Sequence, residues 1–374
     1  MGKVKVLVVD DSAFMRQVIT NHLAADPELE VVGSARDGLA ALEAVSKLHP
    51  DVVTLDVEMP KLDGLGTLRR LMAENPLPVV MVSALTQEGA AATVEALQLG
   101  AVDFVHKPSG SVSLDFHRTK DELVRKVKQA AKAKVHASLL PRLQSRPPKS
   151  VSSPARLHGN TPYRAVVVGS STGGPRALHA FLTELPAWFP VPMLIVQHMP
   201  PGFTRSLAAR LNEACAINVK EAEPGDRLQP GLALLAPGNF HLLVKKNGVV
   251  DLDQGPTVHG VRPSVDVTLK SAVEAYGRQL VAVIMTGMGV DGSEGAAMLH
   301  RLGGAVIAEH ESSCVVYGMP RAVVEAGNAD RVVPLPQIAS ALLEVLQQPL
   351  PVLAPQAADN KAVSRGSQVG SRSV

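Results

Sequence analysis

Short runs of aliphatic residues alternate with helix-like stretches from Val4 to about Lys134. Four of these runs are VKVLVV, DVVTL, PVVMV and AVDFV, and each is bounded by polar or turn-forming residues. Such runs are typical of strands that are buried on both faces. Strands that alternate with helices predict a doubly wound parallel sheet, so we expect one complete α/β domain here.

A second alternation of strand and helix begins at Arg164 and continues to about Gln347. Its aliphatic runs are AVVVG, MLIVQ, LVAVIM and AVIAE, with a more strand-rich insertion around INVKEA, LALLAP and HLLVKK. This pattern predicts a second α/β domain, Rossmann-like, with a mostly parallel sheet. Between the two, residues 124–161 contain a basic helix end and a stretch rich in Pro and Ser, which predicts a linker. Residues 348–374 are expected to form a disordered tail.

The composition narrows the classes of protein that remain. A chain of 374 residues has room for two or three domains, and its 3% of aromatic residues means that aliphatic side chains must fill the cores. The formal net charge of +2 gives little support to nucleic-acid binding. Two cysteines exclude a disulfide framework and a cysteine-based zinc cluster. We see no signal peptide and no membrane-spanning run, and therefore expect a cytoplasmic protein without direct membrane insertion.

Polar side chains follow the predicted strands of the first domain. Asp10 and Asp11 end the first strand, Asp56 and Ser83 end two others, and Lys107 follows the last. The carboxyl ends of parallel strands share the edge at which open α/β sheets place their sites. Crowded carboxylates need a cation, and Mg²⁺ prefers oxygen ligands, while a lysine and a hydroxyl could hold a phosphoryl group. Each aspartate alone could instead cap a helix, but their coincidence at strand ends favours a site.

The motifs VVDDSAFMR, LDVEMPKLDG, VSA and DFVHKP resemble the receiver domain of two-component response regulators, over roughly residues 1–123. The resemblance implies a five-stranded doubly wound parallel sheet that a histidine kinase phosphorylates. Asp56 would be the phospho-acceptor. Mg²⁺ would be bound by Asp10, Asp11, Asp56 and the carbonyl of Glu58.

The same resemblance implies how the receiver would respond to phosphorylation. Ser83 would be the switch hydroxyl, at a position where threonine is also common, and Phe104 would be the switch aromatic residue. Lys107 would pair with the phosphoryl group, and the bond between Lys107 and Pro108 is a candidate cis peptide.

A second set of strand-end residues lies in the other half of the chain. Ser171 stands in GSSTGG after AVVVG, His198 follows MLIVQ, and Asp291 lies in TGMGVDG after LVAVIM. A nucleophile, a base and an orienting carboxylate at one sheet edge suit acyl transfer. The glycines could instead cradle a nucleotide phosphate, but GSSTGG lacks the Walker spacing and its lysine. Each residue alone could be a helix cap or an ordinary strand-end residue, so only the three together favour a triad.

The motifs GSSTGG, VQHMPPGFTRSLAARL, RPSVDV, TGMGVDG and SSCVVYGMP resemble the catalytic domain of the CheB family of chemotaxis protein-glutamate methylesterases, over roughly residues 162–347. The resemblance implies that Ser171 is the nucleophile, His198 the base and Asp291 the third member of the triad. Backbone amides of Met288 and Thr172 would form the oxyanion hole, and the esterase would need no cofactor. The family's motif has alanine where this chain has Ser170, and the position next to Thr-Gly-Gly favours Ser171 over Ser170.

Together, the two resemblances imply an esterase controlled by phosphorylation. The kinase of a chemotaxis pathway would be the phosphodonor. The substrates would be γ-glutamyl methyl esters on the cytoplasmic helices of chemoreceptors, and glutamine at the same sites would be deamidated. The unphosphorylated receiver would cover the esterase site. Two alternatives stay open at this point: a receiver that drives a DNA-binding domain, for which we see no helix-turn-helix pattern, and a receiver fused to a hydrolase with a non-receptor substrate.

Overall fold

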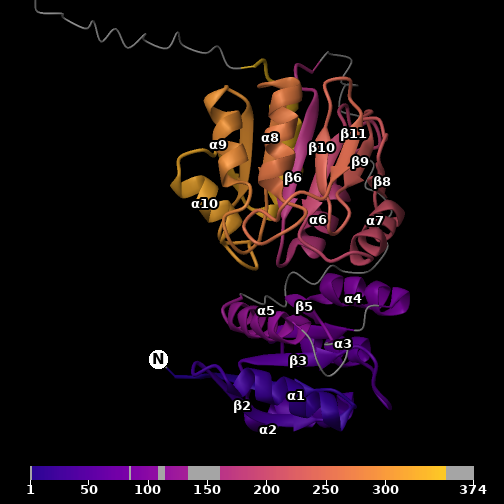
Figure 1. Cartoon of the computed structure of the whole chain (residues 1–374), viewed down its shortest axis with the longest axis vertical. Coiled ribbons are helices and arrows are strands. Elements are labelled where there is room, and N and C mark those ends of the chain that lie inside the picture. The colour runs from indigo at the N-terminus through magenta and orange to yellow at the C-terminus, as the bar shows by residue number, and fades with distance from the viewer. Residues whose placement is uncertain (1, 84–85, 108–113, 134–160, 351–374) are drawn as a thin grey trace, which may run out of the picture.

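A computed structural model describes residues 2–83, 86–107, 114–133 and 161–350 of the chain. Figure 1 shows two α/β units, one stacked on the other. The expected cis bond at Pro108, most of the predicted linker and nearly all of the predicted tail lie outside the described residues.

The first unit is a five-stranded parallel sheet with the strand order β2-β1-β3-β4-β5. The strands are Val4–Val9 (β1), Leu29–Ala35 (β2), Val52–Asp56 (β3), Val79–Ser83 (β4) and Asp103–His106 (β5). Four of them coincide with the predicted aliphatic runs. β2 does not, because it is an edge strand that is buried only at its two end residues and therefore lacks a continuous apolar run.

Helices cover both faces of this sheet. They are Ala13–Ala24 (α1), Gly38–Leu48 (α2), Gly64–Glu74 (α3), Gln87–Leu99 (α4) and Leu114–Ala130 (α5). Apolar side chains of α1 and α5 share one core cluster with the sheet, and those of α2, α3 and α4 share another. Ser12 caps α1 by accepting a hydrogen bond from the backbone N–H of Met15. The cap is therefore Ser12, and the carboxylate of Asp11 is not used for it.

The second unit is a seven-stranded sheet with the order β14-β13-β12-β6-β7-β9-β8, in which all the pairs are parallel. The strands are Ala165–Ser170 (β6), Met193–Gln197 (β7), Asn218–Glu221 (β8), Leu232–Leu235 (β9), Leu280–Ile284 (β12), Ala305–Glu309 (β13) and Arg331–Val333 (β14). The fold class is thus the predicted one. Of the strand-rich insertion, β8 and β9 extend this sheet, whereas His241–Val244 (β10) and Val250–Asp253 (β11) form a separate antiparallel pair.

The helices of the second unit also lie on opposite faces. They are Gly174–Leu182 (α6), Phe203–Ala214 (α7), Val265–Tyr276 (α8), Ser293–Arg301 (α9), Met319–Glu325 (α10) and Leu335–Gln347 (α11). Side chains of α6, α7 and α11 belong to one core cluster, and those of α8, α9 and α10 to the other. β6 and β12 are neighbours, yet the helices that follow them pack on opposite faces. Such a switch point opens a crevice at the carboxyl ends of the strands.

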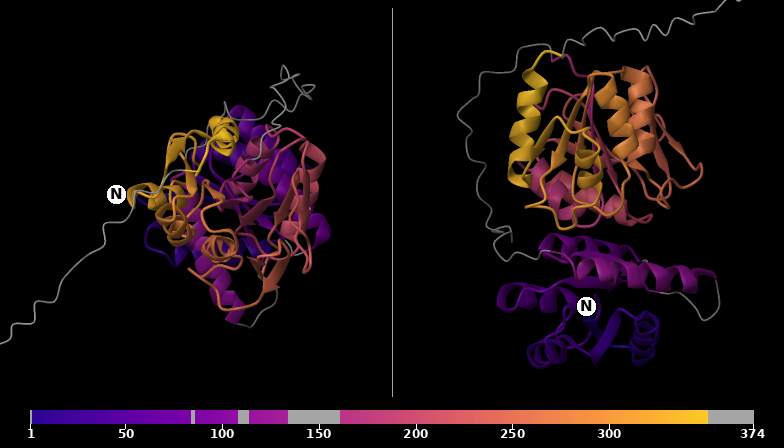
Figure 2. Two further views of the ribbon diagram at one scale, coloured as in Figure 1. Left: turned by 90° about the horizontal axis from the view of Figure 1, so that it is seen from above. Right: turned by 90° about the vertical axis from the view of Figure 1, so that its left-hand side faces the viewer.

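The two units meet through α4, β5 and α5 of the first, which face the ends of α6 and α7 in the second (Figures 1 and 2). The rings of Phe104 and Phe203 pack with their centroids 4.5 Å apart. The guanidinium of Arg210 donates hydrogen bonds to Glu95 at 2.7 Å and to Gln98 at 3.0 Å. The carboxyl edge of the second sheet therefore lies against the first unit. Across the described ranges, no helix is both long enough and apolar enough to cross a membrane.

Gly64 provides a test of how α3 packs on the end of β3. A Cβ atom at Gly64 would lie 2.1 Å from the backbone oxygen of Asp56 and 2.9 Å from the Cα atom of Val57. Because backbone cannot move away as a side chain can, we expect Gly64→Ala to lower the free energy of unfolding by about 1–3 kcal/mol. Urea denaturation of the full chain, followed by circular dichroism, measures this change.

Gly66→Ala is the matched control in the same helix. Its Cβ atom would meet the ends of flexible side chains, Leu62 at 2.7 Å and Asp63 at 3.0 Å. Alanine is also favoured over glycine inside a helix. Equal losses of stability in the two variants would contradict the packing argument.

Candidate active site and phosphorylation site

Two carboxylates and a lysine meet at the carboxyl edge of the first sheet. The Lys107 ammonium lies 2.7 Å from Oδ2 of Asp56 and 3.0 Å from Oδ2 of Asp10. Burial raises the pKa of Asp56 to about 6, although Lys107 acts in the opposite direction. Burial alone would lower the pKa of Lys107, but the two carboxylates raise it. The effect of burial on the Asp56 carboxylate is thus larger than the opposite effect of Lys107.

The same edge offers oxygen ligands for a divalent cation. Asp10, Asp11 and Asp56 each present a carboxylate oxygen, and these three atoms lie within 4.8 Å of one another. Glu58 is near enough to donate its backbone N–H to Oδ1 of Asp56 at 3.4 Å. Hard oxygen donors of this kind, with carboxylate charge in excess, fit Mg²⁺.

The two predicted switch residues lie on neighbouring strands. Ser83 ends β4 and is fully buried, and its hydroxyl donates to the backbone oxygen of Gly89 at 3.2 Å. Phe104 lies on β5, is almost fully buried, and packs against Phe203 of the other unit. The backbone N–H of Lys107 donates to the Ser83 oxygen at 2.8 Å, so these two residues are neighbours, whereas Phe104 faces the second unit.

The two serines of GSSTGG have different surroundings. Ser170 is the last residue of β6 and is 0% exposed, with its hydroxyl donated to Oε1 of Gln197 at 2.7 Å. Ser171 follows the strand, is partly exposed and lines a cavity at the carboxyl edge. Of the two, only Ser171 is placed to react.

His198 and Asp291 form a hydrogen-bonded pair beside Ser171. Nε2 of His198 lies 2.8 Å from Oδ2 of Asp291. A carboxylate accepts the Nε2 proton, which leaves Nδ1 of His198 as the basic nitrogen. All three residues line the same cavity, and no hydrogen bond joins the described Ser171 and His198 side chains. Contacts of this kind commonly tighten only when substrate binds.

Asp291 is held as a charged carboxylate by the start of α8. The backbone N–H groups of Val265 and Asp266 donate to it at 2.7 and 3.0 Å, and the Ser264 hydroxyl donates at 2.7 Å. Burial alone would raise the pKa of Asp291, but His198 and these donors outweigh it and lower the pKa to about 2. Asp291 therefore stays ionised at neutral pH.

Two backbone turns meet at Ser171. The turn that carries Met288 lies so close that a Cβ atom on Gly287 would come 2.9 Å from Cβ of Ser171. Within the described part of the chain, the backbone N–H groups of Thr172 and Met288 donate to no other protein group. Neither N–H group is engaged by a protein acceptor in the described residues, and the oxyanion-hole role of both residues stays a prediction.

The cavity at this edge has a volume of about 640 Å³ and is bounded by both units. The second unit contributes Ser171, Thr172, His198, Met288 and Asp291, and the first unit contributes residues of β5 and α5. Between them, the Thr172 hydroxyl donates to Oδ2 of Asp103 at 2.5 Å, and Arg125 reaches the Met288 sulfur at 3.5 Å. The first unit therefore covers the side of the cavity opposite the second sheet.

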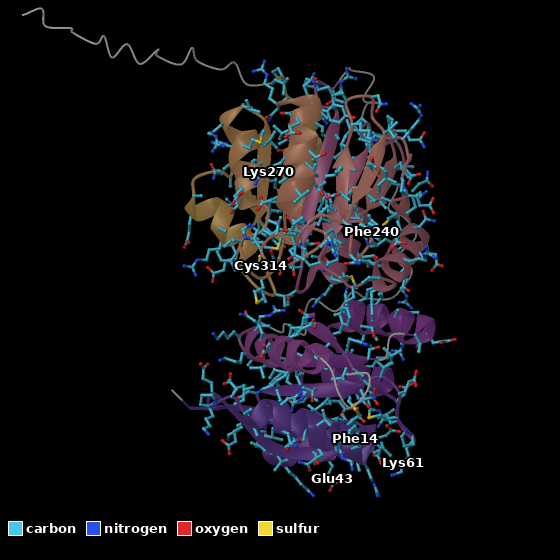
Figure 3. The ribbon with its side chains drawn as sticks, in the orientation of Figure 1. Phe14, Glu43, Lys61, Phe240, Lys270 and Cys314 are labelled. Atoms are coloured by element: carbon cyan, nitrogen blue, oxygen red, sulfur yellow. The ribbon has the colours of Figure 1, made fainter. Side chains whose placement is uncertain are left out.

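Sequence reasoning missed several residues that support this site. Ser264 and Asp266 had a signal, since RPSVDV is one of the motifs that carried the resemblance, but their contact with Asp291 depends on how α8 packs. Gln197 and Asp103 stand in the motifs VQHMPPGFTRSLAARL and DFVHKP, but neither motif indicated the contacts that these two side chains make. Cys314 is buried near the end of the second unit that faces the first (Figure 3).

Comparison with known proteins covers both units. The profile of the family described as CheB methylesterase matches residues 166–342, and that of the response regulator receiver domain matches residues 6–115. A relative in Symbiobacterium thermophilum is 56% identical over 91% of this chain and 96% of its own. The chain belongs to the CheB methylesterase family. This membership confirms the resemblance, and it places an esterase segment where the DNA-binding alternative would need its output domain.

Two further members of the CheB family are similar over nearly their whole length. The one from Thermotoga maritima is 48% identical over 92% of this chain and 98% of its own. The one from Pyrococcus abyssi is 46% identical over 92% of this chain and 94% of its own. All three relatives carry the name protein-glutamate methylesterase/protein-glutamine glutaminase.

Labelling by a fluorophosphonate, which phosphonylates activated serines, tests which serine reacts. We expect one phosphonyl group per chain, located on Ser171, because Ser170 is buried and its hydroxyl proton is engaged. Mass spectrometry of the digested protein identifies the labelled residue.

Ser170→Ala should keep the label, and Ser171→Ala should lose it. Asp291→Asn is a useful third variant, since it keeps Ser171 but weakens the base. Labelling that survives in Ser171→Ala would show that the reactive serine lies elsewhere.

Proposed function

We propose that this protein is a phosphorylation-activated protein-glutamate methylesterase that also deamidates glutamine, and that Ser171, His198 and Asp291 are its catalytic triad. The observation that carries the proposal is the hydrogen bond between His198 and Asp291 in the cavity that Ser171 lines, within the segment that matches the CheB methylesterase family. The names of the relatives supply the substrate class.

The chemistry follows from the positions of these groups. Ser171 Oγ attacks the γ-carbonyl carbon of a glutamyl methyl ester while its proton passes to Nδ1 of His198. The N–H groups of Thr172 and Met288 would stabilise the oxyanion of the tetrahedral intermediate. The bond to the methoxy group then breaks, and His198 returns the proton so that methanol leaves.

A water molecule completes the cycle. His198 removes a proton from the water as it attacks the acyl-enzyme, and then protonates Ser171 Oγ as glutamate leaves. With glutamine as substrate, ammonia takes the place of methanol. Asp291 holds the imidazole in the tautomer that makes Nδ1 basic, and stabilises the imidazolium in both steps.

The first unit supplies the control. Asp56 would accept a phosphoryl group from the kinase of a chemotaxis pathway, and Lys107 would pair with it. Mg²⁺ would be held by Asp10, Asp11, Asp56 and Glu58, and would neutralise charge at the reacting oxygens. Ser83 and Phe104 would transmit the change. The carboxylate excess around Asp56 supports this assignment.

Before phosphorylation, the receiver restrains the esterase. Asp103 accepts a hydrogen bond from the Thr172 hydroxyl, and Arg125 contacts the Met288 sulfur, so side chains of the first unit reach both residues proposed to form the oxyanion hole. We assign residues 1–123 to the receiver, 124–161 to the linker, 162–347 to the esterase and 348–374 to a tail. The substrate would be methylated chemoreceptor helices on the cytoplasmic side, reached without nucleic acid or membrane insertion.

Methanol release from methylated chemoreceptor membranes tests the activity. We expect wild-type protein to release methanol, and a small phosphodonor with Mg²⁺ to increase the rate. Ser171→Ala should be inactive, and Asp56→Asn should keep the basal rate without activation. Full activity of Ser171→Ala would refute the triad. Hydrolysis of simple esters without methanol release from receptors would refute the substrate assignment.

The contact between Asp103 and Thr172 gives a prediction about restraint. Hydrogen bonds to charged groups are worth about 1.5–3 kcal/mol, so Asp103→Ala should shift the closed protein toward the open form and raise basal esterase activity about tenfold or more. Steady-state methanol release without phosphodonor measures this rise, and deletion of residues 1–150 should also raise the rate.

Asp26→Ala is the matched control for that experiment. Asp103 pairs with Lys126 of α5 at 3.0 Å, and Asp26 likewise accepts from Lys128 of α5 at 3.4 Å, but the Asp26 pair lies within the first unit, away from the esterase. Its loss should leave the basal rate unchanged. An unchanged basal rate in Asp103→Ala and in the truncated protein would contradict restraint by the receiver.

A further inference from the structure

One buried amide joins the two turns that carry the nucleophile and the base. Gln197 ends β7 opposite Ser170 of β6, and its side chain is 2% exposed. Its Nε2 donates to the backbone oxygen of Ser171 at 2.9 Å and lies 3.3 Å from that of His198. A single side chain therefore contacts the backbone of both residues.

The neighbouring backbone carbonyls settle the orientation of this amide, and the hydroxyl of Ser170 matches it. Two carbonyl oxygens surround Nε2, and only the NH₂ end of a glutamine can donate to them. Oε1 then faces the Ser170 hydroxyl at 2.7 Å and accepts its proton. Each polar atom of the buried pair has a partner, so the amide has one favourable orientation.

The surrounding backbone leaves little room for the Gln197 side chain to take another position. A Cβ atom on Gly174 would lie 1.9 Å from Oε1 of Gln197, so α6 begins directly against this side chain. The backbone N–H of Gly174 donates to the Ser171 oxygen at 2.7 Å, and that of His198 donates to the Ser170 oxygen at 3.1 Å. Gln197 is therefore part of a hydrogen-bond network that surrounds the turn that carries Ser171.

We propose that Gln197 is a positioning residue for ester hydrolysis, and that Ser170 orients it. Asp291 fixes the ring of His198, but the distance between this ring and Ser171 also depends on how the two backbone turns are held. The side chain of Gln197 holds both of them. This inference rests on the proposed roles of Ser171 and His198.

The role explains the departure from the family's motif at Ser170. An alanine there would leave Oε1 of Gln197 without its hydroxyl donor, whereas serine adds a hydrogen bond that selects the productive orientation. Ser170 is accordingly a support for the nucleophile rather than a second nucleophile.

Steady-state kinetics of the full-length, phosphodonor-activated protein test the proposal. Gln197→Met keeps the volume of the side chain but removes its hydrogen bonds. A misplacement of about 1 Å can cost about 10²-fold in rate, so we expect kcat to fall about 10–100-fold while KM changes less than about twofold. The rate of fluorophosphonate labelling should fall by the same factor. Ser170→Ala should lower kcat only about threefold, since a neutral hydrogen bond is worth about 1 kcal/mol.

Ser271→Ala is the matched control. Ser271 accepts from the Val244 backbone N–H at 2.6 Å and donates to its oxygen at 3.2 Å, so its loss removes comparable hydrogen bonds in the same unit. It touches neither catalytic turn, and kcat should not change. Thermal unfolding of each variant sets an assay temperature at which every protein is folded.

Gln197→Glu supplies a readout that a purely structural role would not give. When protonated, its carboxyl group has one O–H that can donate to a carbonyl, and when ionised it has none. The ratio of its kcat to that of wild type should therefore rise as the pH falls. This ratio keeps the proposal testable if Gln197→Met does not fold.

The outcomes separate this inference from the proposed function. Wild-type kcat in folded Gln197→Met, or a pH-independent ratio for Gln197→Glu, would overturn the positioning role while leaving the triad intact. Activity in Ser171→Ala would overturn the triad itself. A loss of kcat in Gln197→Met that Ser271→Ala reproduces would show that the effect is general destabilisation, and would also overturn the positioning role.

Discussion

The contact of Asp103 with Thr172 places a receiver carboxylate next to the residue that follows the proposed nucleophile. This carboxylate is itself held by the buried Lys126 ammonium at 3.0 Å, which also donates to the backbone oxygen of Phe104 at 2.6 Å. Burial would lower the pKa of Lys126, but Asp103 and Glu122 raise it, so the lysine stays charged. The interface therefore depends on a compensated charge cluster on β5 and α5.

One strand connects this cluster to the phosphorylation site. Asp103 and Phe104 of β5 face the esterase, and Lys107 follows the same strand at the edge where Asp56 lies. Four residues of extended chain span about 13 Å. A phosphoryl group on Asp56 would compete for Lys107, which now bridges Asp56 and Asp10, and this competition acts on the strand that carries the interface. Shifting a 1:99 equilibrium to 99:1 needs about 5.5 kcal/mol, so several contacts must change together.

Local sequence patterns predicted the buried strands and the residues at their ends, but not the contacts that depend on tertiary packing. Strand-end motifs predicted that Asp56 and Lys107 meet at one sheet edge and Ser171, His198 and Asp291 at another, and the structure brings each set together. The strands β2 and β14 were missed, since half-exposed edge strands have no continuous apolar run. The contacts of Asp103 and Gln197 could not be predicted either. One depends on how two folded units dock, and the other depends on which strands become neighbours in the sheet.

The turn that carries Ser171 and Thr172 is held by buried hydrogen bonds within the second unit, in addition to its contact with the first unit. Buried polar groups destabilise a fold unless they are hydrogen-bonded. Here Thr286 donates its hydroxyl to the backbone oxygen of Thr172 at 3.0 Å, and its own N–H donates to the buried Glu309 at 2.8 Å. Burial raises the pKa of Glu309, which lessens the cost of keeping this group inside the core. Because these supports lie within the esterase, the proposed phosphorylation would not have to rearrange Ser171, His198 and Asp291. It would have to release the Thr172 hydroxyl from Asp103 and open the cavity.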